Sequence, residues 1–373
     1  MSLDNANGGV IDASNVDEST NVSLVPAKWG TFVPYESIEN SYNLTTINHF
    51  TREDVLRSCE WIATEKIHGA NFSFFTNGHE IKCARRNGFI APDEDFYNHQ
   101  SMLAKYTLQI LSLHKLMLSK NLIRGEMIII YGELFGGKYP HPDITKGVNE
   151  KSYPIQRGVF YSPKIEFIAF DLFDGVDLLD FDIMKELLDV SDIPYLKPLI
   201  KDSYKNVIQF NPNFTTTIPK LLGYPTPLPP PFDKNMAEGI VIKPAKNIRT
   251  SKRHRVILKI KAPDFDERKK NPDKSNNKRR VTLVDKVIMD LSEFINMNRL
   301  NSVISKQDTK DKNDEVKMVE LLYEDAMKDF MKDEQLKENF LKLSDDKKEK
   351  VKKNGISKAN QVVNKHLMSL CNG

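Results

Sequence analysis

The stretch Thr64–Phe74, TEKIHGANFSF, decides how the first part of the chain is organised, because it places a lysine, a histidine and a glycine beside strand-like runs. The flanking runs Trp61–Thr64 (WIAT) and Asn71–Phe75 (NFSFF) are aromatic and β-branched, as strands are. Lys66 therefore lies where one strand ends, and Gly69 lies where the next begins. Glycine at such a place allows a close backbone approach or a positive φ angle. The spacing K-x-x-G suggests a nucleophile at a tight turn, although it also occurs by chance in many proteins.

A second lysine-rich run would supply what a nucleophilic lysine needs. An exposed lysine with a pKa near 10.4 is almost fully protonated at pH 7, so its neighbours must disfavour the cation. In RVILKIK (255–261) the period of two places Val256, Leu258 and Ile260 on one face and Lys259 and Lys261 on the other. This pattern is typical of an edge strand with solvated lysines. It also fits two cations that bind phosphates and, at about 5 Å from Lys66, lower its pKa by about two units.

Acidic residues border two other strand-like runs. Glu133 ends the apolar run MIIIYGE (127–133), and Glu238 opens EGIVIK (238–243). A carboxylate beside a buried run is costly unless it is paired or binds a metal ion. Together with the lysines, these two acids suggest ribose contacts and a Mg²⁺ site. In IEFIAFDLF (165–173), Phe170 and Asp171 point to opposite faces, so Phe170 is either a core residue or a platform for a base.

Length and composition fit a soluble protein of two domains. The chain has 373 residues, of which 40% are hydrophobic and 28% charged. Its longest apolar runs are far shorter than the roughly 18 residues of a membrane span. The three cysteines, Cys59, Cys83 and Cys371, have no paired spacing. This excludes a disulfide framework or a cysteine-rich zinc site and favours a reducing, intracellular compartment.

Charge is distributed unevenly along the chain. Residues 1–30 have a net charge of −3, whereas residues 243–280 carry fifteen Lys or Arg against four acids, a net charge of +11. Such a local excess favours a polyanionic partner, because binding phosphates releases condensed counterions. A solvated, lysine-rich loop is the alternative interpretation.

The order of patterns predicts four segments. Residues 1–34 are polar, acidic and expected to be disordered, with no signal peptide and no mitochondrial presequence. Residues 35–265 contain the strands, a helix from Phe96 to Lys120 and an extended Pro-rich loop, Tyr224–Phe232. Residues 266–280 form a basic linker, and residues 281–373 form an all-helical domain. Its expected amphipathic helices are 284–300, 316–331 and 356–370.

Six stretches in a fixed order carry a resemblance to covalent nucleotidyltransferases. These are KIHG (66–69), ARRNG (84–88), YGELFG (131–136), FIAFDLF (167–173), EGIVIKP (238–244) and ILKIKA (257–262). Within that superfamily, EKIHGANFSF is most similar to the phage RNA ligase 2 family, which includes RNA-editing ligases. YESIENSYN (35–43) resembles the family's opening segment, and MNRLNSVISK (297–306) resembles the start of its helical domain. The resemblance therefore covers the chain from about residue 35 to near its end.

The resemblance implies an α+β fold. An adenylyltransferase domain of ATP-grasp-like antiparallel sheets with helices would be followed by a small helical domain that engages RNA. It also implies a three-step reaction with ATP and Mg²⁺ or Mn²⁺. Lys66 becomes a lysyl-adenylate, the AMP passes to an RNA 5′-phosphate, and a 3′-hydroxyl displaces it to seal the strand. The expected partner is RNA with such ends, in a duplex or bridged by a template, and the protein is expected to be a monomer.

The same resemblance assigns roles to individual residues. Lys66 is the nucleophile, and Glu238 assists the metal ion. His68, Asp171, Arg299 and Asp325 are implied in RNA binding or the later steps. Contacts with ATP or AMP are implied for Glu65, Lys66, Ile67, Asn71, Arg86, Glu133, Phe170, Lys243, Lys259 and Lys261. Glu133 would reach the ribose, and Phe170 would stack on adenine. Lys243, Lys259 and Lys261 would bind phosphates.

Three alternatives differ in testable ways. DNA ligases and capping guanylyltransferases usually carry a β-barrel after the last lysine motif, where this chain has helical patterns. A capping enzyme would also use GTP. A non-catalytic RNA-binding protein of the same fold would never acquire a covalent label from ATP.

Overall fold

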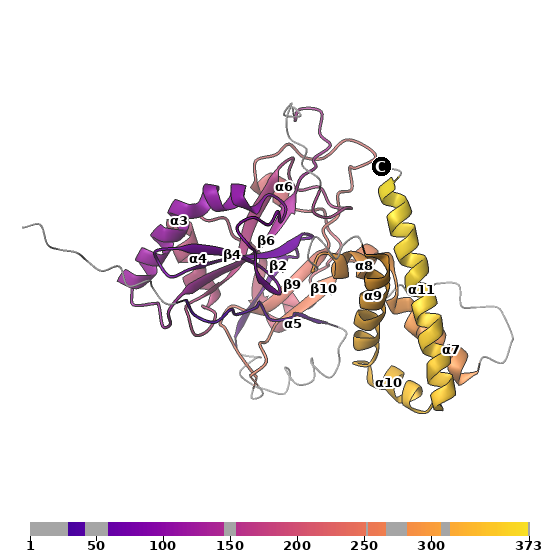
Figure 1. The fold of residues 1–373 in the computed structure, drawn as a ribbon. Coiled ribbons are helices and arrows are strands. Elements are labelled where there is room, and N and C mark those ends of the chain that lie inside the picture. Colours follow the sequence, from indigo (N-terminus) through magenta and orange to yellow (C-terminus); the bar gives the residue numbers. More distant parts are fainter. Residues whose placement is uncertain are drawn as a thin grey trace, which may run out of the picture.

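The computed structural model describes residues 29–41, 59–144, 154–250, 253–265, 282–306 and 314–371. A strand-rich domain with two sheets is followed by a helical domain, and the two lie side by side (Figure 1). The fold is therefore α+β, as predicted. The predicted basic linker, residues 266–280, lies outside the described residues.

The first sheet has the strand order β5-β4-β3-β6-β7, and all its neighbours are antiparallel. Its strands are β3 (Ala70–Thr76), β4 (Ile81–Arg85), β5 (Gly88–Phe89), β6 (Ile128–Gly136) and β7 (Ile165–Phe173). Two helices, α3 (His99–Ser119) and α4 (Phe181–Val190), pack against one face of this sheet. Apolar residues at helical spacing predict this long helix, and all five are buried: Met102, Tyr106, Ile110, Leu113 and Met117. Burial of this amphipathic face stabilises α3.

The segment before the expected domain start covers the other face of this sheet, which corrects the predicted boundary. Residues 1–28 lie outside the described part, but Trp29 and Phe32 pack against the fold. Phe32 stacks on Phe75 with ring centroids 5.6 Å apart, and Trp29 Nε1 donates to Glu80 at 2.9 Å. These two aromatic side chains, isolated in a polar segment, bury apolar area that outweighs the local preference for disorder.

The second sheet has the order β1-β10-β9-β2-β8. Its strands are β1 (Glu39–Asn40), β2 (Glu60–Glu65), β8 (Pro198–Ser203), β9 (Gly239–Pro244) and β10 (Leu258–Lys261). Only β1 runs parallel to its neighbour, β10, among these described strands. The alternation predicted for β10 is confirmed, because Val256, Leu258 and Ile260 pack in one cluster, whereas Ile257 lines the cavity with the lysines. Short helical turns α5 (Tyr204–Val207), α6 (Ile218–Leu221) and η1 (Pro263–Phe265) complete this domain.

Five helices form the described C-terminal domain. They are α7 (Leu283–Phe294), α8 (Met297–Ile304), α9 (Glu315–Phe330), α10 (Glu334–Leu341) and α11 (Asp345–Cys371). The helix predicted over 284–300 is in fact two helices, because Asn296 leaves the helix and its side chain caps the Arg299 N–H. Among the described helices none is long and apolar enough to cross a membrane.

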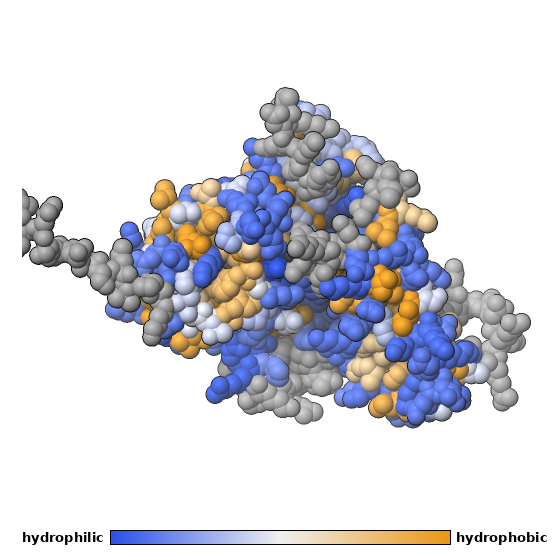
Figure 2. Space-filling model, viewed as in Figure 1, coloured by the Kyte–Doolittle hydropathy of each residue, from blue (hydrophilic) through white to orange (hydrophobic). Residues whose placement is uncertain are grey.

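Polar contacts join the two domains. Lys332, two residues after α9, lies 2.9 Å from Glu39 of β1, and Asn298 Nδ2 donates to the Asp264 carbonyl at 2.7 Å. Asn87 Nδ2 donates to the Lys306 carbonyl at 3.0 Å. In Figure 2 hydrophilic residues predominate where the two domains meet on the visible face. The helical domain is thus attached beside β1 and β10 by polar contacts.

Candidate active site

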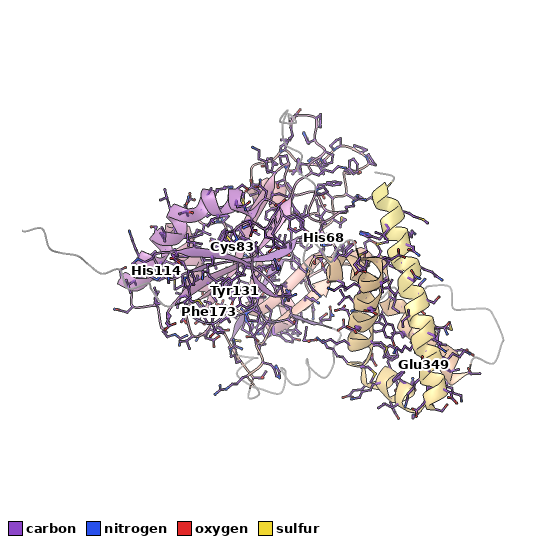
Figure 3. The ribbon with its side chains drawn as sticks, viewed as in Figure 1. His68, Cys83, His114, Tyr131, Phe173 and Glu349 are labelled. Atoms are coloured by element: carbon purple, nitrogen blue, oxygen red, sulfur yellow. The ribbon has the colours of Figure 1, made fainter. Side chains whose placement is uncertain are left out.

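A cavity of about 820 Å³ lies between the two domains and collects most of the residues singled out in the sequence. His68, labelled in Figure 3, lies close to the boundary with the helices. Residues of α8 and α9, among them Asn298, Asp325 and Lys328, line the same cavity. Of the predicted site residues, those that line it are Lys66, Ile67, His68, Asn71, Arg86, Glu133, Phe170, Asp171, Glu238, Lys243, Lys259, Lys261 and Asp325.

Lys66 follows β2 directly and stays fixed to the second sheet. Its backbone N–H donates to the Gly239 carbonyl at 2.9 Å, and its side chain enters the cavity. Gly69 is required by close approach rather than by a positive φ angle. A Cβ at Gly69 would lie 2.1 Å from the Leu134 carbonyl oxygen of β6. The glycine thus lets β3 pair with β6 immediately after the lysine.

Glu238 lies at the centre of the cationic cluster. Its Oε2 is 2.7 Å from Lys66 Nζ and 3.2 Å from His68 Nδ1, and its Oε1 is 3.1 Å from Lys261 Nζ. Burial alone would raise the pKa of Glu238, but Lys66 and Lys261 hold it well below its usual value. The sequence predicted cations around Lys66; the structure adds that a carboxylate bridges two of them.

Glu133 and Asn71 face each other across β6 and β3, on the cavity side. Burial raises the pKa of Glu133 to about 7, although the cations Lys66 and Arg86 oppose this shift. Asn71 Oδ1 is buried without a hydrogen-bond partner. An orphaned buried acceptor is costly, so this atom is suited to a ligand in the cavity.

Phe170 lines the cavity above a buried charge network. Its ring centroid lies 4.7 Å from that of Tyr35. Beneath it, Asp171 accepts hydrogen bonds from the Tyr35 hydroxyl at 2.6 Å and from the two terminal nitrogens of the Arg255 guanidinium, Nη1 and Nη2, at 2.8 Å each. Burial would raise the pKa of Asp171, but Arg255 and Lys243 hold it below its usual value. The network fixes the backbone that carries the platform.

Two predicted roles change because of this network. Lys243 was expected to bind phosphate, but it is 6% exposed and its Nζ is bound to Asp171 Oδ1 at 2.6 Å and to the Phe170 carbonyl at 3.0 Å. Burial lowers the pKa of Lys243 to about 8. Asp171 was expected in RNA binding, yet its carboxylate is committed to Arg255, Tyr35 and Lys243. Lys243 and Asp171 thus stabilise the backbone that carries Phe170, the expected platform for a base.

Glu65 is also placed differently from the prediction. It was expected to flank the nucleotide, but its side chain points away from the cavity. Its carboxylate accepts hydrogen bonds from the Thr216 hydroxyl and, at 2.8 Å, from the Thr217 N–H and hydroxyl. In a strand, successive side chains alternate, and Glu65 points to the side opposite that on which Lys66 enters the cavity. Glu65 ties the strand before the nucleophile to the 216–217 segment.

Arg299, which the resemblance implied in RNA binding or the later steps, is fully buried in this structure. Its side chain is 0% exposed, and its nitrogens lie 2.5 Å from Asp325 Oδ2 and 3.0 Å from Asp329 Oδ2. It also donates to the Phe294 carbonyl at 2.8 Å. Arg299 therefore holds two acids of α9 at the cavity wall.

Sequence reasoning missed Tyr35, Arg255 and Thr216. A signal for Arg255 was present, because it shares the odd-numbered face of the RVILKIK run with Lys259 and Lys261. Tyr35 belongs to the opening segment YESIENSYN, which was used only as a resemblance. Nothing in the sequence pairs Thr216 with Glu65, since their contact depends on the fold.

The donor set fits a magnesium ion that is shared with a ligand. No group of three or more His, Cys, Asp or Glu that could hold a metal by itself occurs among the described residues. Glu238 offers a carboxylate and Asn71 an unpartnered carbonyl oxygen in the cavity. Mg²⁺ commonly uses one or two such oxygens together with phosphates and water.

Comparisons with known proteins identify similar chains. The family model described as RNA ligase matches residues 59–261, and the model of the T4 RNA ligase 2 C-terminal region matches residues 279–361. Mitochondrial RNA-editing ligase 2 of Trypanosoma brucei brucei is 30% identical over 81% of this chain and 83% of the relative. Mitochondrial RNA-editing ligase 1 is 31% identical over 74% of this chain and 71% of the relative.

Among solved structures, a Naegleria gruberi RNA ligase has a TM-score of 0.41 and 15% identity, covering 66% of this chain and 61% of the other. The family model spans more than half of the chain, and it includes Lys66, Glu133, Glu238 and Lys261. The chain therefore belongs to the RNA ligase family, and its C-terminal domain is of the T4 RNA ligase 2 type.

Proposed function

We propose that the protein is an ATP-dependent ligase that joins an RNA 3′-hydroxyl to a 5′-phosphate through an adenylate on Lys66. The observation that carries this is the single cavity in which Lys66, Glu133, Glu238, Lys259 and Lys261 meet. The substrate ends belong to a duplex or are bridged by a template, and the protein acts as a monomer.

In the first step the Lys66 Nζ attacks the α-phosphorus of ATP. A P–N bond forms, the bond to the bridging oxygen breaks, and pyrophosphate leaves with the electron pair while the amine loses its proton. In the second step an oxygen of the RNA 5′-phosphate attacks the same phosphorus, the P–N bond breaks, and Lys66 leaves with the electron pair and takes up a proton to regenerate its amine. In the third step the 3′-hydroxyl attacks the RNA phosphate, AMP leaves and the hydroxyl proton is released.

The residues of the cavity bind, orient and neutralise charge. Lys259 and Lys261 bind phosphates, Glu133 accepts a hydrogen bond from the ribose, and Phe170 stacks on the adenine. A Mg²⁺ or Mn²⁺ ion held by Glu238 and Asn71 would neutralise the phosphates during transfer. Phosphoryl transfer needs mostly such positioning and electrostatic stabilisation.

Incubation with ATP labelled at the α-phosphate tests this proposal. The wild-type protein should acquire a covalent adenylate that mass spectrometry places on Lys66. Lys66→Ala should abolish the label, and GTP should not replace ATP. Labelling of the Lys66→Ala protein, or no label on the wild type with Mg²⁺ present, would refute the assignment.

A second experiment separates the two domains. Removal of residues 281–373 should spare self-adenylylation and impair sealing of nicked duplex RNA, because α8 and α9 form one wall of the cavity. Sealing by the truncated protein at the rate of the full chain would show that the helical domain does not engage RNA.

A further inference from the structure

One wall of the cavity has no role in the reaction described above. It is formed by Phe160 and Phe232 with two exposed cations, Arg157 and Lys234. The two rings meet edge to face, with centroids 5.0 Å apart. Phe232 is 36% exposed, so much of its ring is not stabilised by burial within the protein. We call these four residues the aromatic wall.

The aromatic wall is held in place by Asn235. The Asn235 side chain accepts from the Phe160 N–H at 2.8 Å and donates to the Phe160 carbonyl at 2.7 Å. The Asn235 N–H also donates to the Phe232 carbonyl at 3.1 Å. The prolines of the preceding Pro-rich loop restrict its φ angles. One asparagine thus ties together the backbone segments that carry both rings, and the rings contact each other.

The aromatic wall is also tied to the reaction centre. The Asn235 carbonyl accepts from the Thr216 N–H at 3.0 Å, and Thr216 in turn holds Glu65, the residue before the nucleophile. On the other side, the hydroxyl of Tyr161, next to Phe160, accepts from the His68 N–H at 2.9 Å. The rings are therefore linked on both sides of Lys66, whereas Phe170 belongs to a different strand, β7.

We propose that the aromatic wall binds the terminal nucleotide of the RNA strand that receives AMP, with its base stacked on Phe232 and its phosphates near Arg157 and Lys234. This inference rests on the proposed function. Aromatic rings beside cations are the recurrent means of binding a single-stranded base and its backbone. The 5′-phosphate must reach the adenylate on Lys66. The base of the same terminal nucleotide must therefore lie no farther from Lys66 than the length of one nucleotide.

The test uses full-length protein carrying a preformed lysyl-adenylate and RNA with a 5′-phosphate. The 5′-terminal nucleotide either carries its base or is abasic. Phe232→Ala should raise the RNA concentration for half-maximal AMP transfer about tenfold to hundredfold with the normal end. With the abasic end, wild type and variant should differ by less than about twofold. Phe232→Tyr should restore the preference for the base.

Controls separate stacking from general damage. Leu221→Ala removes an exposed apolar side chain, 42% exposed, from α6 outside the cavity, and should change neither substrate. An equal loss on both RNA ends, or none, would overturn the inference. A loss confined to ATP labelling would also overturn it, because the ring would then serve the nucleotide. If the wild-type protein acquires no label from ATP, the ligase assignment itself is refuted. If the wild type is labelled and the Phe232 variant transfers AMP normally, only the role of the aromatic wall is refuted.

Discussion

The Lys66 Nζ lies 2.7 Å from Glu238 Oε2, so the candidate nucleophile and the candidate metal ligand form an ion pair in the structure. The other oxygen of Glu238 contacts Lys261. Release of Lys66 for attack therefore requires another positive group to take its place at Glu238. A divalent metal that arrives with the nucleotide is suited to this exchange.

Glu238→Gln should slow adenylyl transfer to RNA by about a hundredfold or more, because the amide cannot compensate the cations or hold the metal as a carboxylate does. The Mg²⁺ concentration for half-maximal rate should also rise. Glu65→Gln is the matched control, since it removes a buried negative charge next to Lys66 but outside the cavity. An equal shift of the Mg²⁺ dependence in both variants would contradict a metal-binding role for Glu238.

Glu133 should make both nucleotide affinity and stability depend on pH. Its pKa of about 7 lies above that of an unfolded glutamate, so the folded protein favours the protonated form. The stability that this provides is full below about pH 4.5 and is lost as the pH rises through 7. Glu133→Gln should therefore be more stable than wild type at pH 8 by about 3 kcal/mol without nucleotide, and equal near pH 4.5. Urea unfolding at both pH values measures the difference.

Nucleotide binding should show the opposite pH trend. The ionised carboxylate of Glu133 is a better acceptor of a hydrogen bond from a ribose hydroxyl than the protonated form. The ATP affinity of the wild type should therefore rise between pH 6 and pH 8. Glu133→Gln should lose this rise. A pH profile that is the same in both proteins would assign the dependence to another group.

Asp171→Asn should destabilise the strand-rich domain, because it leaves the cations of Arg255 and Lys243 in the interior without a full counter-charge. Breaking a buried ion pair in this way costs about 3–5 kcal/mol. The double variant Asp171→Asn, Lys243→Met should recover part of the loss, since one of the buried cations is removed as well. Thermal denaturation of the three proteins measures this, and identical values for the single and double variants would contradict it.

Arg299→Ala should unfold or loosen the helical domain, again at a cost of about 3–5 kcal/mol, because Asp325 and Asp329 lose their buried partner. Arg299→Lys should not restore stability, since an ammonium group cannot reach both carboxylates and the Phe294 carbonyl as the guanidinium does. Circular dichroism during urea unfolding gives the comparison. A folded Arg299→Ala protein of unchanged stability that binds RNA more weakly would contradict this structural role and favour the role in RNA binding that the resemblance implied.

Periodicity alone predicted much of the fold. The run Ile165–Phe173 is the whole of β7, and the apolar face expected for β10 packs as predicted. These predictions succeed because alternation and helical spacing are local properties of the chain. The break between α7 and α8 was missed because apolar residues continue through it, although Asn296 is a favourable N-cap.

The partners of charged residues could not be predicted in the same way. The sequence indicates that Lys243 and Asp171 belong near the site, but not that they neutralise each other beneath Phe170. Their pairing depends on the packing of β7 against β9, which lie in different sheets. The position of Glu238 between Lys66 and Lys261 depends in the same way on contacts between separate strands.

The contacts that hold the helical domain over the cavity are individually weak. The Lys332–Glu39 bridge is partly exposed at both ends, and the hydrogen bonds of Asn298 and Asn87 are made to single carbonyls. Bonds of these kinds contribute about 1 kcal/mol each or less. We therefore expect thermal motion alone to separate the helices from the rest of the cavity, without a separate energy source, and a distance probe joining positions 39 and 332 would follow each opening.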